Sequence, residues 1–203
     1  MKIKRFTIAS LFAVCLYIIF TAISFFYYPT AYSPMTNWLS DLGNPLQNPS
    51  GAIYYKIGGV LTSSVLILFF AGMYSWLTKD KRTNFFLWAS IASGILLSVA
   101  FIVTALFPLG VATSTHSFFS ILRFAFTGLF VTFSASAVRR MPSHVSWLPA
   151  FGIALAMVNF AVCISFFFVD FYVGEWITIA LFIAYILALS FSYKATIPVA
   201  SLG

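Results

Sequence analysis

Charged residues are scarce in this chain of 203 residues. Only 7% of them are Asp, Glu, Lys or Arg, whereas a soluble domain carries roughly 25%, and 62% are hydrophobic. Acidic residues are the rarest, with four Asp and Glu against eleven Lys and Arg. A chain with a mean hydropathy of +1.01 and so little charge has no polar surface to offer water, so we expect an integral membrane protein.

Motifs for metal, nucleotide or nucleophile chemistry are also missing. The chain has no GxSxG, HExxH, CxxC, Walker or GxGxxG pattern, and it has only two cysteines and two histidines. His116 and His144 are expected on opposite sides of the membrane, so they form neither a metal site nor a bis-histidine haem site. We therefore expect no metal and no cofactor.

Six long apolar runs dominate the sequence. Each approaches or exceeds the ~18 to 20 residues that cross a bilayer as a helix, and they cover 6–27, 53–77, 85–107, 118–138, 147–169 and 176–193. The predicted fold is all-α, a polytopic bundle of six transmembrane helices that forms one domain over residues 1–203.

The basic residues predict the orientation of this bundle. They gather at the N-terminus, in the second and fourth connections and at the C-terminus, which lie on one side of a six-span chain. By the positive-inside rule that side is cytoplasmic, so we expect a cell membrane protein with both termini inside. The net charge of +7 is then explained by topology and by attraction to anionic lipid, and it gives no sign of a nucleic-acid partner.

The longest polar insertion, residues 28–52, is expected on the outer side. Ser33 followed by Pro34 is a helix start signal and Gly43 is a stop signal, so the pattern predicts a short helix over 34–42. Its apolar residues recur at i, i+3, i+4 and i+7 on one face, and Asp41 lies on the other. This spacing predicts an amphipathic helix lying flat at the membrane interface.

The fourth span carries an unusual polar stripe. His116, Ser120 and Arg123 follow at steps of four and three residues, so they share one face of the helix in its outer half. A charged side chain at that depth costs at least about 2.5 to 3.5 kcal/mol on insertion scales. We therefore expect Arg123 to face the bundle and to pair with an outer acid, which the sequence leaves open as Asp41, Asp170 or Glu175.

These residues predict a binding site in the outer half of the bundle, closed by the first loop folding back over it. Its candidate residues are Asp41, Lys56, His116, Ser120, Arg123, Asp170 and Glu175. Simpler roles exist for two of them, since Lys56 has the position of a snorkelling lysine and Glu175 that of a helix cap. Asn159, near the middle of the fifth span, is expected to make an interhelical hydrogen bond.

Short motifs along most of the chain carry a family resemblance. They are Tyr28-Pro29, the run Trp38-Leu39-Ser40-Asp41-Leu42-Gly43, the run Asn48-Pro49-Ser50-Gly51, and Phe107-Pro108 with His116 and Arg123 after it. With these motifs the chain resembles the prokaryotic six-span family known as domain of unknown function 998, and more distantly the Frag1/DRAM/Sfk1 membrane proteins. The resemblance implies a six-helix fold and, for the distant relatives, a connection to lipid handling. It carries no catalytic role over to any residue.

Three functions fit these features. The first is a protein that is not an enzyme and binds a lipid or small amphiphile in the outer polar cavity, with Arg123 and Lys56 for an anionic head. The second is an accessory subunit of a larger membrane complex or a small transporter, in which the polar cluster is structural. The third is an enzyme acting on lipid-linked substrates, with His116 as acid or base, Asp41 orienting it and Arg123 stabilising a phosphate or oxyanion.

Overall fold

The computed structural model describes residues 5–141 and 145–192, and within these ranges all regular secondary structure is helical. Two short 3-10 helices, η1 and η2, accompany six long α-helices. Their bounds are α1 Arg5–Phe26, η1 Leu39–Gly43, α2 Ala52–Gly72, η2 Met73–Trp76, α3 Lys81–Leu106, α4 Thr113–Val138, α5 Leu148–Ser165 and α6 Tyr172–Ser192. All six α-helices are long and apolar enough to cross a bilayer, so the predicted all-α, multi-pass membrane class is confirmed.

The observed helices differ from the predicted spans mainly at their ends. α3 begins at Lys81 rather than at 85 because the Asp80 carboxylate caps it, accepting hydrogen bonds from the backbone N–H groups of Arg82 and Thr83. α4 begins at Thr113, and α5 ends at Ser165, well before the predicted 169. The predicted end of the last span, 193, lies outside the described residues.

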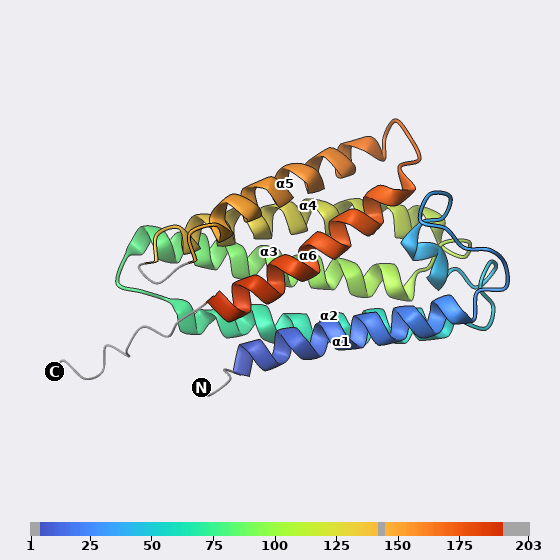
Figure 1. Ribbon diagram of the computed structural model, residues 1–203, viewed down its shortest axis with the longest axis horizontal. Helices are drawn as coiled ribbons and strands as arrows, with labels where there is room; N and C mark the ends of the chain where they lie inside the picture. Colours follow the sequence, from blue (N-terminus) through green and yellow to red (C-terminus); the bar gives the residue numbers. More distant parts are fainter. Residues whose placement is uncertain (1–4, 142–144, 193–203) are drawn as a thin grey trace.

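The helices pack as an antiparallel bundle in which chain neighbours lie together. The most extensive contacts are between α3 and α4, α1 and α2, and α4 and α5, whereas α6 has fewer contacts with α1 (Figure 1). Hydrogen bonds from Ser10 and Thr7 to Ser190 join α1 to α6 near one end. Toward the end that carries η1, α6 diverges from α1 (Figure 1). This divergence leaves room for a cavity described below.

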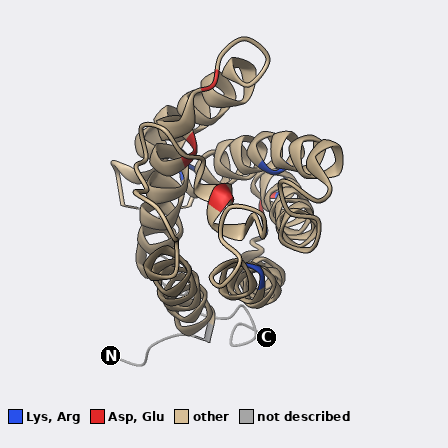
Figure 2. Cartoon of the chain, turned by 90° about the vertical axis from the view of Figure 1, so that its right-hand side faces the viewer, with Lys and Arg blue, Asp and Glu red and all other residues tan. Residues whose placement is uncertain are grey.

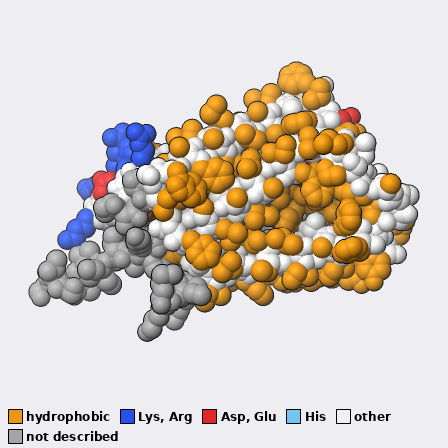
Figure 3. Space-filling view, viewed as in Figure 1, with side chains coloured by type: hydrophobic (Ala, Val, Ile, Leu, Met, Phe, Trp, Pro, Cys, Tyr) orange, Lys and Arg blue, Asp and Glu red, His pale blue; other side chains and the backbone are white. Residues whose placement is uncertain are grey.

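The two ends of the bundle differ in charge. Lys and Arg side chains gather at the end formed by the α2–α3 and α4–α5 links, which we call the basic end (Figure 3). The opposite end, which we call the loop end, carries the η1 segment and the α3–α4 and α5–α6 links (Figure 1). In the view of Figure 3, hydrophobic side chains are spread over the surface between the ends and no charged side chain is visible there.

The predicted flat helix over 34–42 is wrong. Residues after Ser33 form a turn, and η1 begins only at Leu39. Leu39 and Leu42 are buried, at 2% and 0% exposed, whereas Met35 is 70% exposed, so the predicted common apolar face does not exist. Ser33 stabilises the turn and starts no helix, because its hydroxyl accepts a hydrogen bond from the Met35 N–H at 3.2 Å.

A carboxylate explains why the segment restarts as a tight 3-10 turn. Asp41 Oδ2 accepts a hydrogen bond from the Trp38 N–H at 2.9 Å, which satisfies the backbone where η1 begins. All five residues of η1 are buried against the ends of α1, α2 and α6. The segment therefore plugs the bundle instead of lying at its surface.

A buried asparagine fastens this loop to the bundle. Asn48, fully buried, donates to the backbone oxygens of Ser24 and Leu42, and its own oxygen accepts from the Gly51 N–H. The Ser24 hydroxyl also donates to the Leu42 oxygen at 2.9 Å. Viewed from the loop end, η1 lies over the middle of the helices (Figure 2). The loop thus folds back over the bundle as the sequence predicts.

Candidate functional site

A buried ion pair links α4 to α6. Arg123 lies ten residues into α4, about 15 Å from the start of the helix, and its Nη2 is 2.9 Å from Glu175 Oε1. Arg123 is 7% exposed and Glu175 is 2% exposed. The predicted pairing of Arg123 with an acid is confirmed, and the acid is Glu175.

Aromatic rings hold the guanidinium of Arg123. Its central carbon lies 5.1 Å from the ring centroid of Phe101 on α3 and 4.8 Å from that of Phe124 on α4. These are cation–π distances, and they replace part of the hydration that the charge loses on burial. The arginine therefore has a charge partner and two ring faces, and it does not extend into lipid.

The first loop completes the ion pair. Glu175 Oε2 accepts hydrogen bonds from the backbone N–H and the hydroxyl of Ser40, at 3.2 and 3.3 Å. A buried carboxylate needs such partners on its remaining lone pairs, since desolvation otherwise exceeds the gain from pairing. Glu175 is thus the point where α4, α6 and η1 meet, a larger role than that of a helix cap.

A polar cleft of about 320 Å³ lies at the loop end beside this pair. It is walled by η1, the α3–α4 link, α4 and the α5–α6 link. The residues that line it include four hydroxyl side chains, two carboxylates, a histidine and three aromatic rings: Trp38, Ser40, Leu109, Thr113, His116, Ser117, Ser120, Ile121, Phe124, Phe166, Asp170 and Glu175.

His116 has one ring nitrogen engaged and one without a partner. Its Nδ1 lies 3.1 Å from the backbone oxygen of Thr104 and 3.0 Å from that of Phe107. Because carbonyl oxygens only accept, Nδ1 carries the proton, which leaves Nε2 of the neutral ring as an acceptor. Nε2 has no hydrogen-bond partner among the residues that the structure describes, although His116 is only 5% exposed. A buried acceptor of this kind is available to a ligand that donates a hydrogen bond.

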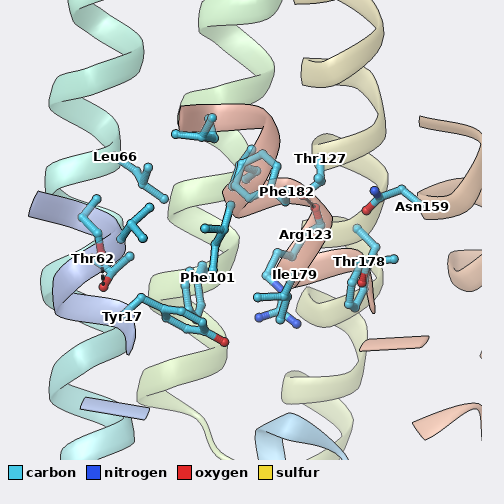
Figure 4. A pocket seen from close by; sticks show the side chains of 16 residues that line it. Tyr17, Thr62, Leu66, Phe101, Arg123, Thr127, Asn159, Thr178, Ile179 and Phe182 are labelled. Atoms are coloured by element: carbon cyan, nitrogen blue, oxygen red, sulfur yellow. Dashed lines mark hydrogen bonds between the residues drawn. The ribbon is translucent and has the colours of Figure 1, made fainter. Parts of the chain in front are cut away.

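A second, inner cavity of about 60 Å³ lies deeper in the bundle. Arg123 and Phe124 line it, and Phe124 also lines the polar cleft, so this helical turn of α4 separates the two spaces. Most of its other walls are apolar side chains from α1, α3 and α6 (Figure 4). The site is therefore divided into a polar space and an apolar space by the ion pair and its rings.

The structure brings together four of the seven predicted site residues in the polar cleft. His116, Ser120, Asp170 and Glu175 line it, with Asp170 exposed at the surface, and Arg123 lies behind Glu175. Lys56 does not join them. It is half-exposed on α2, lines neither cavity, and forms no ion pair with the described residues.

Asp41 is near the cleft but does not line it. Its Oδ2 accepts from the Trp38 N–H. Burial raises the pKa of Asp41 from 3.8 to about 6, with the Trp38 N–H opposing the rise and the Glu175 carboxylate adding to it. The proposed orienting contact from Asp41 to His116 is wrong, since His116 is oriented by the two backbone oxygens.

Several residues that build the site were not predicted from the sequence. Ser40 donates hydrogen bonds to Glu175. The ring of Phe101 contacts Arg123, and the ring of Phe166 lines the cleft. Serine and phenylalanine are common in membrane helices, so no sequence signal distinguishes these positions.

One comparison with known proteins gives a match. The model of a family described as "Protein of unknown function (DUF998)" matches residues 11–194, which is most of the chain. No curated protein and no solved structure matches the chain at a significant level.

Proposed function

The chain belongs to the DUF998 family, a family of unknown function, and from that premise we propose that it binds a membrane amphiphile whose amine-bearing head occupies the polar cleft. One observation carries the proposal. The cleft presents acceptors and aromatic rings, while the one cation beside it in the described part of the chain is already neutralised by Glu175.

The balance of charge favours a cationic or zwitterionic head. Arg123 is paired with Glu175, and Lys56 lies elsewhere, so Asp170 is the uncompensated charge among the residues that line the cleft. An anionic head, as first expected, would meet the uncompensated carboxylate of Asp170. An ammonium group would instead be attracted by Asp170 at the rim.

Aromatic walls give an ammonium group a second kind of contact. The ring of Phe166 lies 5.4 Å from that of Trp38 and 5.2 Å from that of Phe124, and all three rings line the cleft. Ring faces grouped in this way attract quaternary and primary ammonium ions, by about 0.5 to 2 kcal/mol for each contact. The unpartnered Nε2 of His116 would accept one N–H or O–H of the same head.

The location of the cleft supports an amphiphile rather than a water-soluble ligand. Its walls are the loop ends of helices that have the length and hydropathy of membrane spans. A volume of about 320 Å³ accommodates a head group but no complete lipid, so the chain of the ligand would lie along the apolar helices.

We propose that the basic end faces the cytoplasm and that the cleft faces the outside of the cell membrane. Lys79, Lys81, Arg82, Arg139 and Arg140 lie at the basic end, and three of the four acids lie at the loop end. This distribution follows the positive-inside rule. The head groups within reach of the cleft would then be those of the outer leaflet.

A catalytic role has one observation in its favour, the free Nε2 of His116, which is the arrangement of a general base. No hydrogen bond joins this atom to Ser117 or Ser120, so the described residues contain no activated nucleophile beside it. Binding is therefore the function we propose. The accessory-subunit and transporter hypotheses have no specific observation in their favour.

Two single-chain probes with opposite charge test the proposal. Dodecylammonium and dodecanoate are titrated below their micellar concentrations into the protein in nanodiscs, with the rise in melting temperature as the measure of binding. We expect the ammonium probe to stabilise the protein and dodecanoate to have little effect. Asp170→Asn should weaken ammonium binding about threefold, as the loss of an exposed ionic contact does.

Two variants, one that fills the cleft and one that removes a lysine far from it, show whether the ammonium probe binds in the cleft. Ser120→Leu should abolish ammonium binding by occupying the cleft, whereas Lys56→Gln should leave it unchanged, since Lys56 lines neither the polar cleft nor the inner cavity. Equal stabilisation by both probes, or ammonium binding that survives Ser120→Leu, would overturn the proposal.

A further inference from the structure

The inner cavity opens toward the bilayer between two helices. α1 and α6 supply most of its apolar lining, including Val14, Ile179 and Ile183. The surface is hollowed between these two helices toward the loop end (Figure 3). The hydrogen bonds of Ser10 and Ser190 close the same helix pair near the basic end. A lipid chain beside the protein therefore has lateral access to this cavity without passing through the polar cleft.

Asn159 presents an unsatisfied acceptor to the cavity. The side chain is fully buried and reaches from α5 toward the cavity (Figure 4). Its Nδ2 donates to the Leu155 backbone oxygen at 3.0 Å, which fixes the orientation of the amide, because the opposite assignment would place two oxygens together. Oδ1 is left without a partner in the described ranges 5–141 and 145–192. The interhelical bond expected for Asn159 is thus absent among the described residues.

The same cavity also carries free donors. Apart from the bond of Nη2 to Glu175, the N–H groups of Arg123 make no hydrogen bond with the described residues. Within a membrane no bulk water satisfies such groups. A cavity that is mostly apolar but has an acceptor and donors on its walls suits a chain that carries one small polar group.

We propose that the inner cavity binds an uncharged lipid alcohol, whose hydroxyl donates to Asn159 Oδ1 and whose chain lies between α1 and α6. A hydroxyl group matches these walls because it both donates and accepts. A charged group does not, since Arg123 is already neutralised by Glu175 and any further charge would be buried without compensation. The site is separate from the polar cleft and goes beyond the function proposed for it.

Water is the rival occupant. A cavity of about 60 Å³ exceeds the ~15 Å³ that one water needs by the same measure. Water would satisfy Asn159 Oδ1 equally well. If water stays in the cavity, however, an alcohol gains nothing from its hydroxyl, and an alcohol and an alkane should bind equally. The test therefore compares two probes that differ in the hydroxyl alone.

The probes are hexadecan-1-ol and hexadecane, each carrying the same diazirine in mid-chain. Both probes are equilibrated with the protein in nanodiscs and photolysed. The labelled residues are then identified by peptide mass spectrometry. We expect the alcohol to label the lining residues of α1 and α6 roughly tenfold more than the alkane, from the hydrogen bond to a buried acceptor. In Asn159→Leu, labelling by the alcohol should fall to the level of the alkane.

Three further variants make the outcome decisive. Ile183→Trp fills the cavity and should remove labelling by both probes, so it tests the site if Asn159→Leu fails to fold. Met157→Leu, on the exposed face of the same helix as Asn159, should change nothing. Ser120→Leu alters the polar cleft and should leave this labelling intact, which separates a failure here from a failure of the proposed function. Equal labelling of the lining by both probes in the wild type, or alcohol labelling that persists in Asn159→Leu, would overturn the inference in favour of water.

Discussion

The Arg123–Glu175 ion pair is the contact whose loss we expect to destabilise the protein most. Glu175→Gln removes the negative charge and keeps the size of the side chain. The amide oxygen of Gln still accepts the two hydrogen bonds from Ser40, so the first loop keeps its attachment. The variant loses the charge that neutralises Arg123, which is 7% exposed. It also loses the acceptor of the hydrogen bond from Arg123, because the Gln amide nitrogen takes the place of Oε1.

The magnitude follows from the burial of both partners. Removing one member of a buried pair costs about 3 to 5 kcal/mol, mainly because the other charge is left without compensation. The rings of Phe101 and Phe124 retain part of the stabilisation of the guanidinium, so we expect the lower value, about 3 kcal/mol. In Arg123→Met combined with Glu175→Gln no charge is left unpaired. That double variant should recover about 2 kcal/mol relative to Glu175→Gln alone.

The assay is the free energy of unfolding in mixed micelles titrated with sodium dodecyl sulfate, followed by circular dichroism. Asp170→Asn is the matched control, because Asp170 is exposed and forms no ion pair with the described residues. We expect it to change the stability by less than about 0.5 kcal/mol. If Glu175→Gln also unfolds within 0.5 kcal/mol of the wild type, or if the double variant is no more stable than the single one, the ion pair does not stabilise the bundle in the way argued here.

Two further perturbations test the loop and the helix packing. Because burial raises the pKa of Asp41 to about 6, the folded protein holds a proton that the unfolded chain releases near 3.8, so stability should fall as the pH rises from about 4 to 6. Asp41→Asn should remove that dependence and be more stable at pH 7.5, by at most about 3 kcal/mol; unfolding curves of both proteins against pH check this, and parallel curves would contradict it. Gly94→Val should destabilise by about 1 to 3 kcal/mol or more, because its Cβ would lie 2.5 Å from the buried ring of Phe70, whereas Gly72→Ala meets nothing closer than 3.8 Å. Melting temperatures compare the two glycine variants, and equal values would show that α3 has room to move.

Much of the architecture was predictable because the bilayer imposes simple constraints. An apolar run must be about 20 residues long to cross it, so the six spans follow from hydropathy alone. The free-energy cost of an unpaired charge in hydrocarbon is equally general, and it predicted that Arg123 faces the bundle and pairs with an acid. Both arguments depend on the solvent and hardly on the details of packing.

The first loop shows where pattern arguments fail. Residues 34–42 have the spacing of an amphipathic helix, yet they form a turn followed by η1. Periodicity assumes that one face meets lipid and the other meets water. Here Leu39 and Leu42 are buried by the ends of other helices, and the Asp41 carboxylate stabilises a tighter turn.

The sequence by itself determined that this is a six-helix membrane protein with a buried cation in its fourth helix, because chain length, hydropathy and the energy of a charge in lipid leave few alternatives. Only the tertiary structure decided that Glu175 is the partner, that Lys56 lies apart, and that the polar residues enclose two separate spaces. Three acids lay within plausible reach of Arg123 along the chain. The choice among them depends on how α6 diverges from α1 and where η1 settles, and those positions come from the packing of many side chains together rather than from any single local pattern.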